Sequence, residues 1–203
     1  MATSATTPAG RTTLAVATGP ADVPGWVRRW CRRSGRPVSA APGPGDQSAA
    51  VTGGAALLVT RGRTEQPTSP VVVAAVRDLP ADRPVLAAAA EAAGYLGGTV
   101  LAVHAVPLSF GERSVGLGEA VRHGLRLLDE AVDTLTRRGI PVEVRLVRRW
   151  PHEVVGEDLG EDLGAGLLVL GSARRDPLRP FGPVARSALS HAPCPVLVVP
   201  RPL

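Results

Sequence analysis

Expected strands alternate with helical stretches along the C-terminal two-thirds of the chain. They lie at residues 71–76, 99–106, 141–147, 167–170 and 196–199. The first of them is a continuous apolar run, which is typical of a strand that is buried on both faces of a sheet. The stretches between them are rich in alanine or space their apolar residues by three or four positions, as helices do. These stretches cover residues 82–96, 115–138, 151–163 and 182–190. The alternation predicts an α/β fold for residues 70–203, with a five-stranded parallel sheet and helices on both faces.

The N-terminal third repeats this pattern in a shorter form. We expect strands at 14–17, 37–40 and 56–60 and a helix at 22–34. The sequence at 55–62 parallels that at 165–172, which indicates an internal repeat whose first copy has lost the long helix and the final helix–strand pair. Breaks rich in proline occur at 42–45 and 64–70, and the second marks the boundary between the two units. The predicted organisation is a flexible tail at 1–11, a truncated α/β half at 12–66 and a complete domain at 70–203.

Positive charge is concentrated in the same N-terminal third. All 23 basic residues are arginines, and the net charge is +5. Residues 1–66 hold eight arginines and three acidic residues, whereas the remainder of the chain is neutral. A nucleic-acid partner would therefore have to bind the N-terminal third. The chain has no lysine and no asparagine, which is typical of a high-GC genome, so its arginines are weak evidence for such a partner and we expect none.

The helix expected at 22–34 has two contrasting faces. One face carries Trp26, Val27, Trp30 and Cys31, and the other carries Arg28, Arg29, Arg32 and Arg33. The interpretation that we favour is an amphipathic helix that docks on the short sheet. The alternative is a basic adaptor surface, at residues 26–36, for an anionic partner such as nucleic acid, an acidic protein or membrane headgroups.

Cysteine usage and hydropathy indicate a cytoplasmic protein. Cys31 and Cys194 are far apart and form no CxxC pattern, so no disulfide framework is expected. The first residues contain no signal-peptide core, and no apolar run reaches the ~18 residues that a membrane span needs.

Neither a metal site nor catalytic residues are evident. The four histidines lack metal-ligand spacing, and His104, at the end of an expected strand, is read either as a packed side chain or as a ligand contact. The acids of the doubled Gly-Glu-Asp-Leu segment are expected on a solvated helix face: Glu157, Asp158, Glu161 and Asp162. No nucleophile elbow and no Ser/His/Asp arrangement is visible, so we expect a protein that is not an enzyme.

The C-terminal segment resembles the end of universal stress protein (UspA) domains. Its strand leads into Gly171-Ser172, then into an arginine-rich loop and the helix start at Gly182, and it ends in His-Ala-Pro-Cys-Pro and a valine-rich strand at 191–199. The resemblance covers roughly residues 70–200. It implies an adenine-nucleotide α-hydrolase-like fold and a role in the stress response. It also implies homodimers that pair along the final strand, and ATP binding through a loop of pattern G-x2-G-x9-G-[ST].

This resemblance gives a set of candidate residues for binding a nucleotide. They are Asp78, Val106, Gly171, Ser172, Arg174, Gly182 and Val184. In the family loop, glycines let backbone N–H groups surround the phosphates, and the N-terminus of a helix adds positive potential.

The chain departs from the family pattern at several of these positions. Arg174 occupies the second glycine position, and the stretch up to Gly182 is two residues too short. Pro183 replaces the Ser/Thr and removes both a hydroxyl and a backbone N–H. The acid that the family places directly after its first strand is displaced to Asp78.

We therefore expect a regulatory module that binds ATP weakly or not at all. The rival interpretation is an ATP-binding switch with at most slow hydrolysis. In that case Arg174, Arg175 and Arg179 would replace the lost phosphate donors.

The final strand at 196–199 is wholly apolar and needs a cover at the sheet edge. The cover is expected to be either a second chain or the N-terminal half of the same chain.

Overall fold

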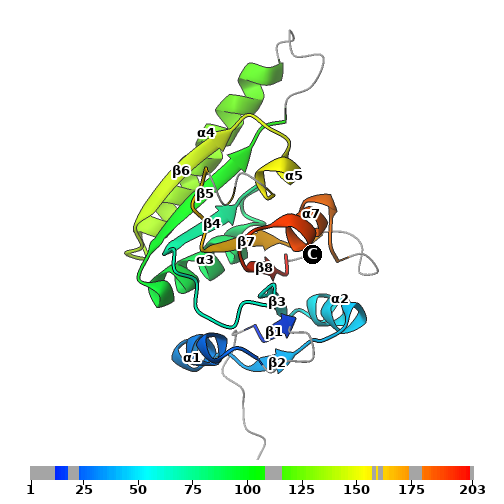
Figure 1. The fold of residues 1–203 in the computed structure, drawn as a ribbon. Helices are drawn as coiled ribbons and strands as arrows, with labels where there is room; N and C mark the ends of the chain where they lie inside the picture. The colour runs from blue at the N-terminus through cyan, green and yellow to red at the C-terminus, as the bar shows by residue number, and fades with distance from the viewer. Residues whose placement is uncertain are drawn as a thin grey trace, which may run out of the picture.

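The computed structural model describes residues 12–17, 23–107, 116–156, 159, 162–173 and 180–201. Within these ranges the strands form one mixed sheet in the order β2-β1-β3-β8-β7-β4-β5-β6, with helices on both faces (Figure 1). The strands are β1 (Leu14–Ala17), β2 (Val38–Ala40), β3 (Ala56–Val59), β4 (Val71–Ala75), β5 (Thr99–Ala105), β6 (Val142–Val147), β7 (Leu167–Gly171) and β8 (Val196–Val199). The helices are α1 (Gly25–Ser34), α2 (Pro44–Thr52), α3 (Arg83–Leu96), α4 (Gly116–Thr136), α5 (Pro151–Val154) and α7 (Pro183–His191).

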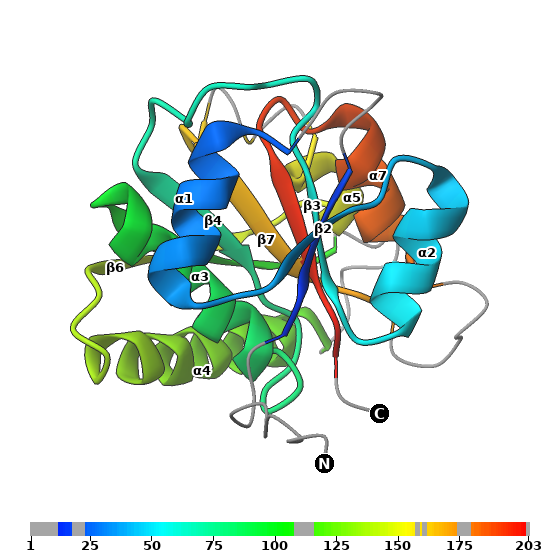
Figure 2. The ribbon, with the colours of Figure 1, turned by 90° about the horizontal axis from the view of Figure 1, so that it is seen from below.

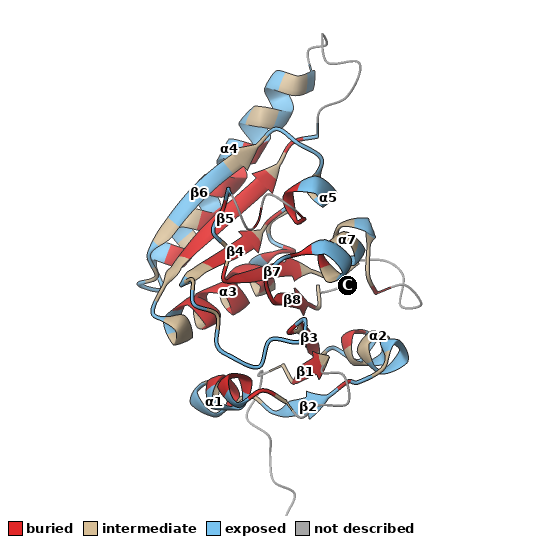
Figure 3. Ribbon diagram, in the orientation of Figure 1, coloured by how far each residue is buried: buried red, intermediate tan, exposed pale blue. Residues whose placement is uncertain are grey.

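The C-terminal unit contains the five-stranded parallel sheet that the sequence predicts. Every strand pair from β8 through β7, β4 and β5 to β6 is parallel. One face packs against α1, α3 and α4, and the other packs against α2, α5 and α7 (Figure 2). The central strands are therefore buried on both sides (Figure 3), which explains why their sequences are unbroken apolar runs.

The sheet is larger than five strands because the N-terminal half continues it. Strands β2, β1 and β3 are mutually parallel. Strand β3 then pairs antiparallel with β8, with Leu57 opposite Val198 and Val59 opposite Val196. In this structure the N-terminal half of the same chain covers the apolar edge of β8.

Two helices differ from the sequence-based expectation. The segment around 42–45 was expected as a break, but Pro44 begins α2. Proline suits the first turn of a helix because the N–H that it lacks has no partner there, and Asp46 accepts a bond of 3.0 Å from the N–H of Gly43. The helix expected at 151–163 is also shorter, because α5 ends at Val154 and a turn follows. Residues 157, 158, 160 and 161 lie outside the described part of the chain. No described helix is long and apolar enough to cross a membrane.

The apolar face of α1 joins the N-terminal half to α3 through stacked aromatic rings. Trp26 and Trp30 are buried and stack with ring centroids 6.3 Å apart. Trp30 also stacks on Tyr95 of α3 at 6.1 Å, and the Tyr95 hydroxyl donates to the carbonyl of Trp26 at 3.1 Å. The opposite face of α1 is exposed and carries Arg28, Arg29, Arg32 and Arg33.

A second contact between the halves lies at the C-terminal end of α7. Arg61 donates to the carbonyls of Leu189 (2.7 Å) and Ser190 (3.1 Å), and Arg63 donates to the carbonyl of Pro193 at 2.8 Å. Carbonyl groups at a helix end lack partners within the helix, and cations there are favoured by the helix dipole. Close by, burial raises the pKa of the Cys194 thiol to about 11, so this cysteine is a packed, unreactive side chain.

A chain that lacks residues 1–66 is expected to associate through β8. The deletion removes β3 and leaves a wholly buried apolar strand as an open sheet edge. Light scattering of the truncated and full-length chains at equal concentration measures the difference. A truncated chain that stays monomeric and soluble would show that β8 needs no cover.

Candidate functional site

A cavity of about 730 Å³ opens at the carboxyl ends of β4, β5 and β7. The chain runs outward from β4 to β5 and β6 on one side, and it returns to β7 and β8 on the other. The neighbouring strands β4 and β7 therefore diverge into connections on opposite sides, and open α/β sheets bind ligands at such a switch point. The volume is within the range of small-molecule pockets.

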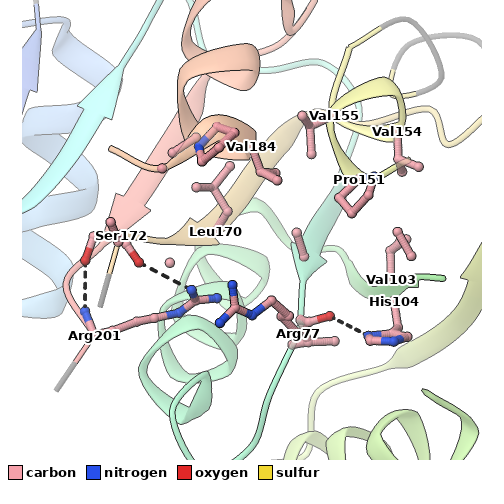
Figure 4. A pocket seen from close by; sticks show the side chains of 18 residues that line it. Arg77, Val103, His104, Pro151, Val154, Val155, Leu170, Ser172, Val184 and Arg201 are labelled. Atoms are coloured by element: carbon pink, nitrogen blue, oxygen red, sulfur yellow. Dashed lines mark hydrogen bonds between the residues drawn. The ribbon is translucent and has the colours of Figure 1, made fainter. Parts of the chain in front are cut away.

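The two ends of the cavity differ in polarity (Figure 4). One end is walled by apolar side chains from β5, β7, α5 and α7, namely Val103, Pro151, Val154, Val155, Leu170 and Val184. The other end carries polar side chains, namely Arg77, His104, Ser172 and Arg201. None of the described lining residues is acidic.

A buried ion pair lies beneath the polar end. The side chain of Asp82 is completely buried, and its Oδ1 accepts a bond of 2.5 Å from Nε of Arg201, whose side chain is 10% exposed. The other oxygen, Oδ2, accepts from the backbone N–H groups of Arg77 (2.7 Å) and Asp78 (3.1 Å). Asp82 therefore fixes both the turn after β4 and the segment after β8.

Arg201 is held across the start of the glycine loop. Its backbone N–H donates to Oγ of Ser172 at 3.1 Å, and its Nη1 donates to the carbonyl of Ser172 at 3.3 Å. A Cβ at position 171 would collide with the guanidinium of Arg201, so Gly171 is needed for this close approach.

The backbone donors at the start of the loop are already bonded within the protein. The N–H of Ser172 donates to the carbonyl of Val199, and the N–H of Ala173 donates to the carbonyl of Pro180, both at 2.8 Å. At the far end of the loop, Gly182 precedes α7, and Pro183 is its first residue and has no N–H. Only the next amides of the first turn, beginning at Val184, are left to face a ligand.

The structure brings some of the candidate nucleotide-binding residues together. Gly171, Ser172, Gly182 and Val184 line the cavity. Asp78 and Val106 are not among its lining residues: Asp78 is bonded to Asp82 through its N–H, and the N–H of buried Val106 donates to the carbonyl of Val147. Arg174, like Arg175 and Arg179, lies outside the described residues.

Sequence reasoning missed two residues of the polar end, Arg77 and Arg201, and the buried Asp82 that lies beneath it. Arg77 stands directly before the displaced acid, so its place after β4 was a usable signal. Asp82 precedes the first turn of α3, where an acid is ordinarily read as a helix cap. Arg201 is separated from Asp82 by 119 positions, and nothing local in the sequence connects them.

His104 is packed at the side of the cavity. Its Nδ1 lies 2.9 Å from the carbonyl of Val76, which places a proton on Nδ1. The opposite edge of the ring lies against Gly124 of α4, where a Cβ would collide with it. This packing accounts for the histidine without a ligand. Among the described residues, no group of three or more His, Cys, Asp or Glu side chains is arranged to hold a metal ion.

A parallel sheet, a cavity at its switch point, and a glycine loop that leads into a helix N-terminus together define an α/β protein with a small-molecule pocket. The model of the universal stress protein family matches residues 69–200. The chain therefore belongs to the universal stress protein family, as the sequence resemblance predicts. No curated protein matches the chain.

Solved structures of this family are similar in fold. A universal stress protein from Archaeoglobus fulgidus is 30% identical, with a TM-score of 0.55, over 64% of this chain and 97% of its own. A universal stress protein from the same organism, solved in complex with dAMP, is 28% identical with a TM-score of 0.51, over 66% of this chain and 98% of its own. A putative universal stress protein from Pseudomonas aeruginosa, at 16% identity and a TM-score of 0.56, covers 94% of this chain and 83% of its own. Its likeness extends the fold comparison into the N-terminal half.

Proposed function

We propose that this universal stress protein is a regulatory module without catalytic activity, whose cavity senses a small ligand and binds ATP weakly or not at all. The observation that carries the proposal is that the backbone N–H donors of the glycine loop are either bonded within the protein or missing. The amides of Ser172 and Ala173 are bonded to carbonyls of the protein, and Pro183 has no amide to offer. A triphosphate would have to break these bonds, and few backbone donors would be left to replace them.

The chemistry of the cavity supports a binding role. The described lining residues include no carboxylate, so a carboxylate general base is missing from this part of the wall. The hydroxyl of Ser172 accepts from the N–H of Arg201, and Nδ1 of His104 is bonded to a backbone carbonyl. No hydrogen bond joins the hydroxyl of Ser172 to the ring of His104, so these two described groups form no pair of nucleophile and base.

A second candidate is a switch that responds to an adenine nucleotide. It is favoured by the 28%-identical relative from Archaeoglobus fulgidus that was solved with dAMP. A monophosphate needs fewer donors than a triphosphate, so the bonded loop is a smaller obstacle to it.

The basic-adaptor alternative has less support. Nε of Arg28 donates to the carbonyl of Val23 at 3.0 Å, and the guanidinium of Arg33 lies 5.6 Å from the centre of the Tyr95 ring. These arginines thus make contacts within the fold, which supports an exposed helix face rather than a dedicated anion-binding surface.

A thermal-shift series tests the proposal. We expect AMP and dAMP to raise Tm more than ATP with magnesium, because the donors for additional phosphates are already bonded. A ligand at a hundred times its Kd stabilises the folded state by about 2.7 kcal/mol, which is readily measured. Adenosine is the control without a phosphate. A larger shift with ATP than with AMP would contradict weak ATP binding and favour the ATP switch.

A further inference from the structure

We propose that Arg77 and Arg201 form an anion subsite that holds the phosphate of a small phosphate monoester, with the apolar body of the ligand against the valine-rich wall. This inference rests on the proposed function only in taking the cavity as a ligand site. It proposes that the phosphate group of the ligand binds to two arginines that lie outside the family loop motif.

The two arginines reach the polar end of the cavity from different parts of the chain. Arg77 follows β4 and Arg201 follows β8, and both line the cavity. Their side chains point toward one another from opposite sides (Figure 4). Like charges in such an arrangement repel, so an anion between them is favoured.

The charge at this end of the cavity is only half compensated. Asp82 pairs with Arg201 through Oδ1, and its Oδ2 is occupied by the two backbone N–H groups of the turn. Asp82 is therefore paired with the guanidinium of Arg201 alone, and the described lining residues supply no acid for the guanidinium of Arg77. About one positive charge is left to face the cavity, which an anionic ligand would neutralise.

Arg201 is already ordered for binding. Its Nε and Nη1 are bonded to Asp82 and to the carbonyl of Ser172, and its side chain is 10% exposed. Nη2 makes no hydrogen bond to any residue in the part of the chain that the structure describes. A ligand would therefore meet a fixed donor, which lowers the entropy cost of binding. Arg77 is exposed and closes the site from the other side.

The position of the two arginines favours phosphate over carboxylate. A single guanidinium fork satisfies both oxygens of a carboxylate. A phosphate monoester presents three terminal oxygens, so it can accept bonds both from the fork of Arg77 and from Nη2 of Arg201, which approach from opposite sides. The apolar wall at the other end suits an uncharged ring or chain, which gives the ligand its amphipathic character.

The test uses the full-length, isotope-labelled protein and phenyl phosphate, a minimal ligand with one phosphate and one apolar ring. We expect saturable shifts of the amide signals of Gly171, Ser172 and Arg201. Benzyl alcohol, which has no charge, and benzoate, which has a carboxylate, are expected to bind at least about tenfold more weakly. Added salt is expected to weaken the binding of phenyl phosphate.

Two variants assign the arginines. Arg77→Gln is expected to weaken phenyl phosphate binding about tenfold or more, because one charged donor is lost. The matched control is Arg83→Gln, an exposed arginine outside the cavity lining, which is expected to bind as the wild type does. Arg201→Lys keeps the positive charge beside Asp82 and, with folding verified by its Tm, is expected to bind several-fold more weakly because an ammonium lacks the planar fork.

Three results would overturn the subsite. They are no saturable binding of phenyl phosphate, equal binding by Arg77→Gln and the wild type, or equal binding of benzoate and phenyl phosphate. The result of the phenyl phosphate test can be distinguished from the result of the thermal-shift series with nucleotides. If nucleotides bind and Arg77→Gln has no effect, the subsite fails and the sensing function stands. If nucleotides fail and phenyl phosphate binds in an Arg77-dependent manner, the adenine-nucleotide switch fails and the subsite stands.

Discussion

Replacing Trp30 with alanine is expected to lower the free energy of unfolding by about 3–5 kcal/mol. The side chain is 1% exposed and is stacked between Trp26 and Tyr95. Its removal leaves a cavity where α1 meets α3, at the junction of the N-terminal half with the complete domain. Urea unfolding followed by circular dichroism measures the loss.

The matched control for this variant is Trp150→Ala. Trp150 is 41% exposed and precedes α5, so its truncation is expected to cost about 1 kcal/mol or less. Trp30→Phe is expected to lie between the two, because the ring stays and the buried indole N–H, which has no hydrogen-bond partner, is removed. Equal losses for Trp30→Ala and Trp150→Ala would mean that the aromatic stack does not join the two halves.

Replacing Arg201 with methionine is expected to cost about 3–5 kcal/mol of stability. The change leaves the completely buried carboxylate of Asp82 with two backbone N–H donors and no counter-charge. The Tm of the variant and its urea midpoint measure the effect.

Two further variants show whether the effect belongs to the buried pair. Arg83→Met breaks an exposed contact with Glu130 at 3.7 Å and is expected to cost at most about 1 kcal/mol. The double variant Asp82→Asn with Arg201→Met is expected to recover most of the loss, because the asparagine oxygen still accepts from the turn amides and no charge is buried. A double variant as unstable as Arg201→Met alone would show that the lost packing of the arginine, and not the unpaired charge, causes the defect.

The sequence was sufficient to predict the C-terminal sheet because its signals are local. Strands such as β4 and β8 are unbroken apolar runs, and a proline or glycine marks most helix ends. Helix α2 was missed because Pro44 can either break a chain or begin a helix, and its neighbours have no apolar periodicity. The pairing of β3 with β8 is non-local, and an apolar run shows that a strand exists without showing which strand lies beside it.

The residues of the candidate site also fall into two groups, those that a local motif predicts and those whose role depends on a distant partner. The residues that line the cavity from the loop and from the start of α7, such as Gly171 and Gly182, were found because a motif fixes their spacing. Asp82 and Arg201 were missed because each looks like an ordinary surface residue until the fold brings the pair together. A buried charge has no sequence signature of its own, since its meaning depends on a partner that is distant in the chain.

The antiparallel junction of β3 and β8 has a consequence for how the protein responds to dilution. Two separate chains that meet along a strand come apart when their concentration falls below Kd. Here both strands belong to one chain, so each experiences an effective concentration set by the connecting chain and not by the amount of protein in solution. The pairing of β3 with β8 should therefore persist when only a few copies of the protein are present. The cavity beside β7 should then keep the same shape at any expression level.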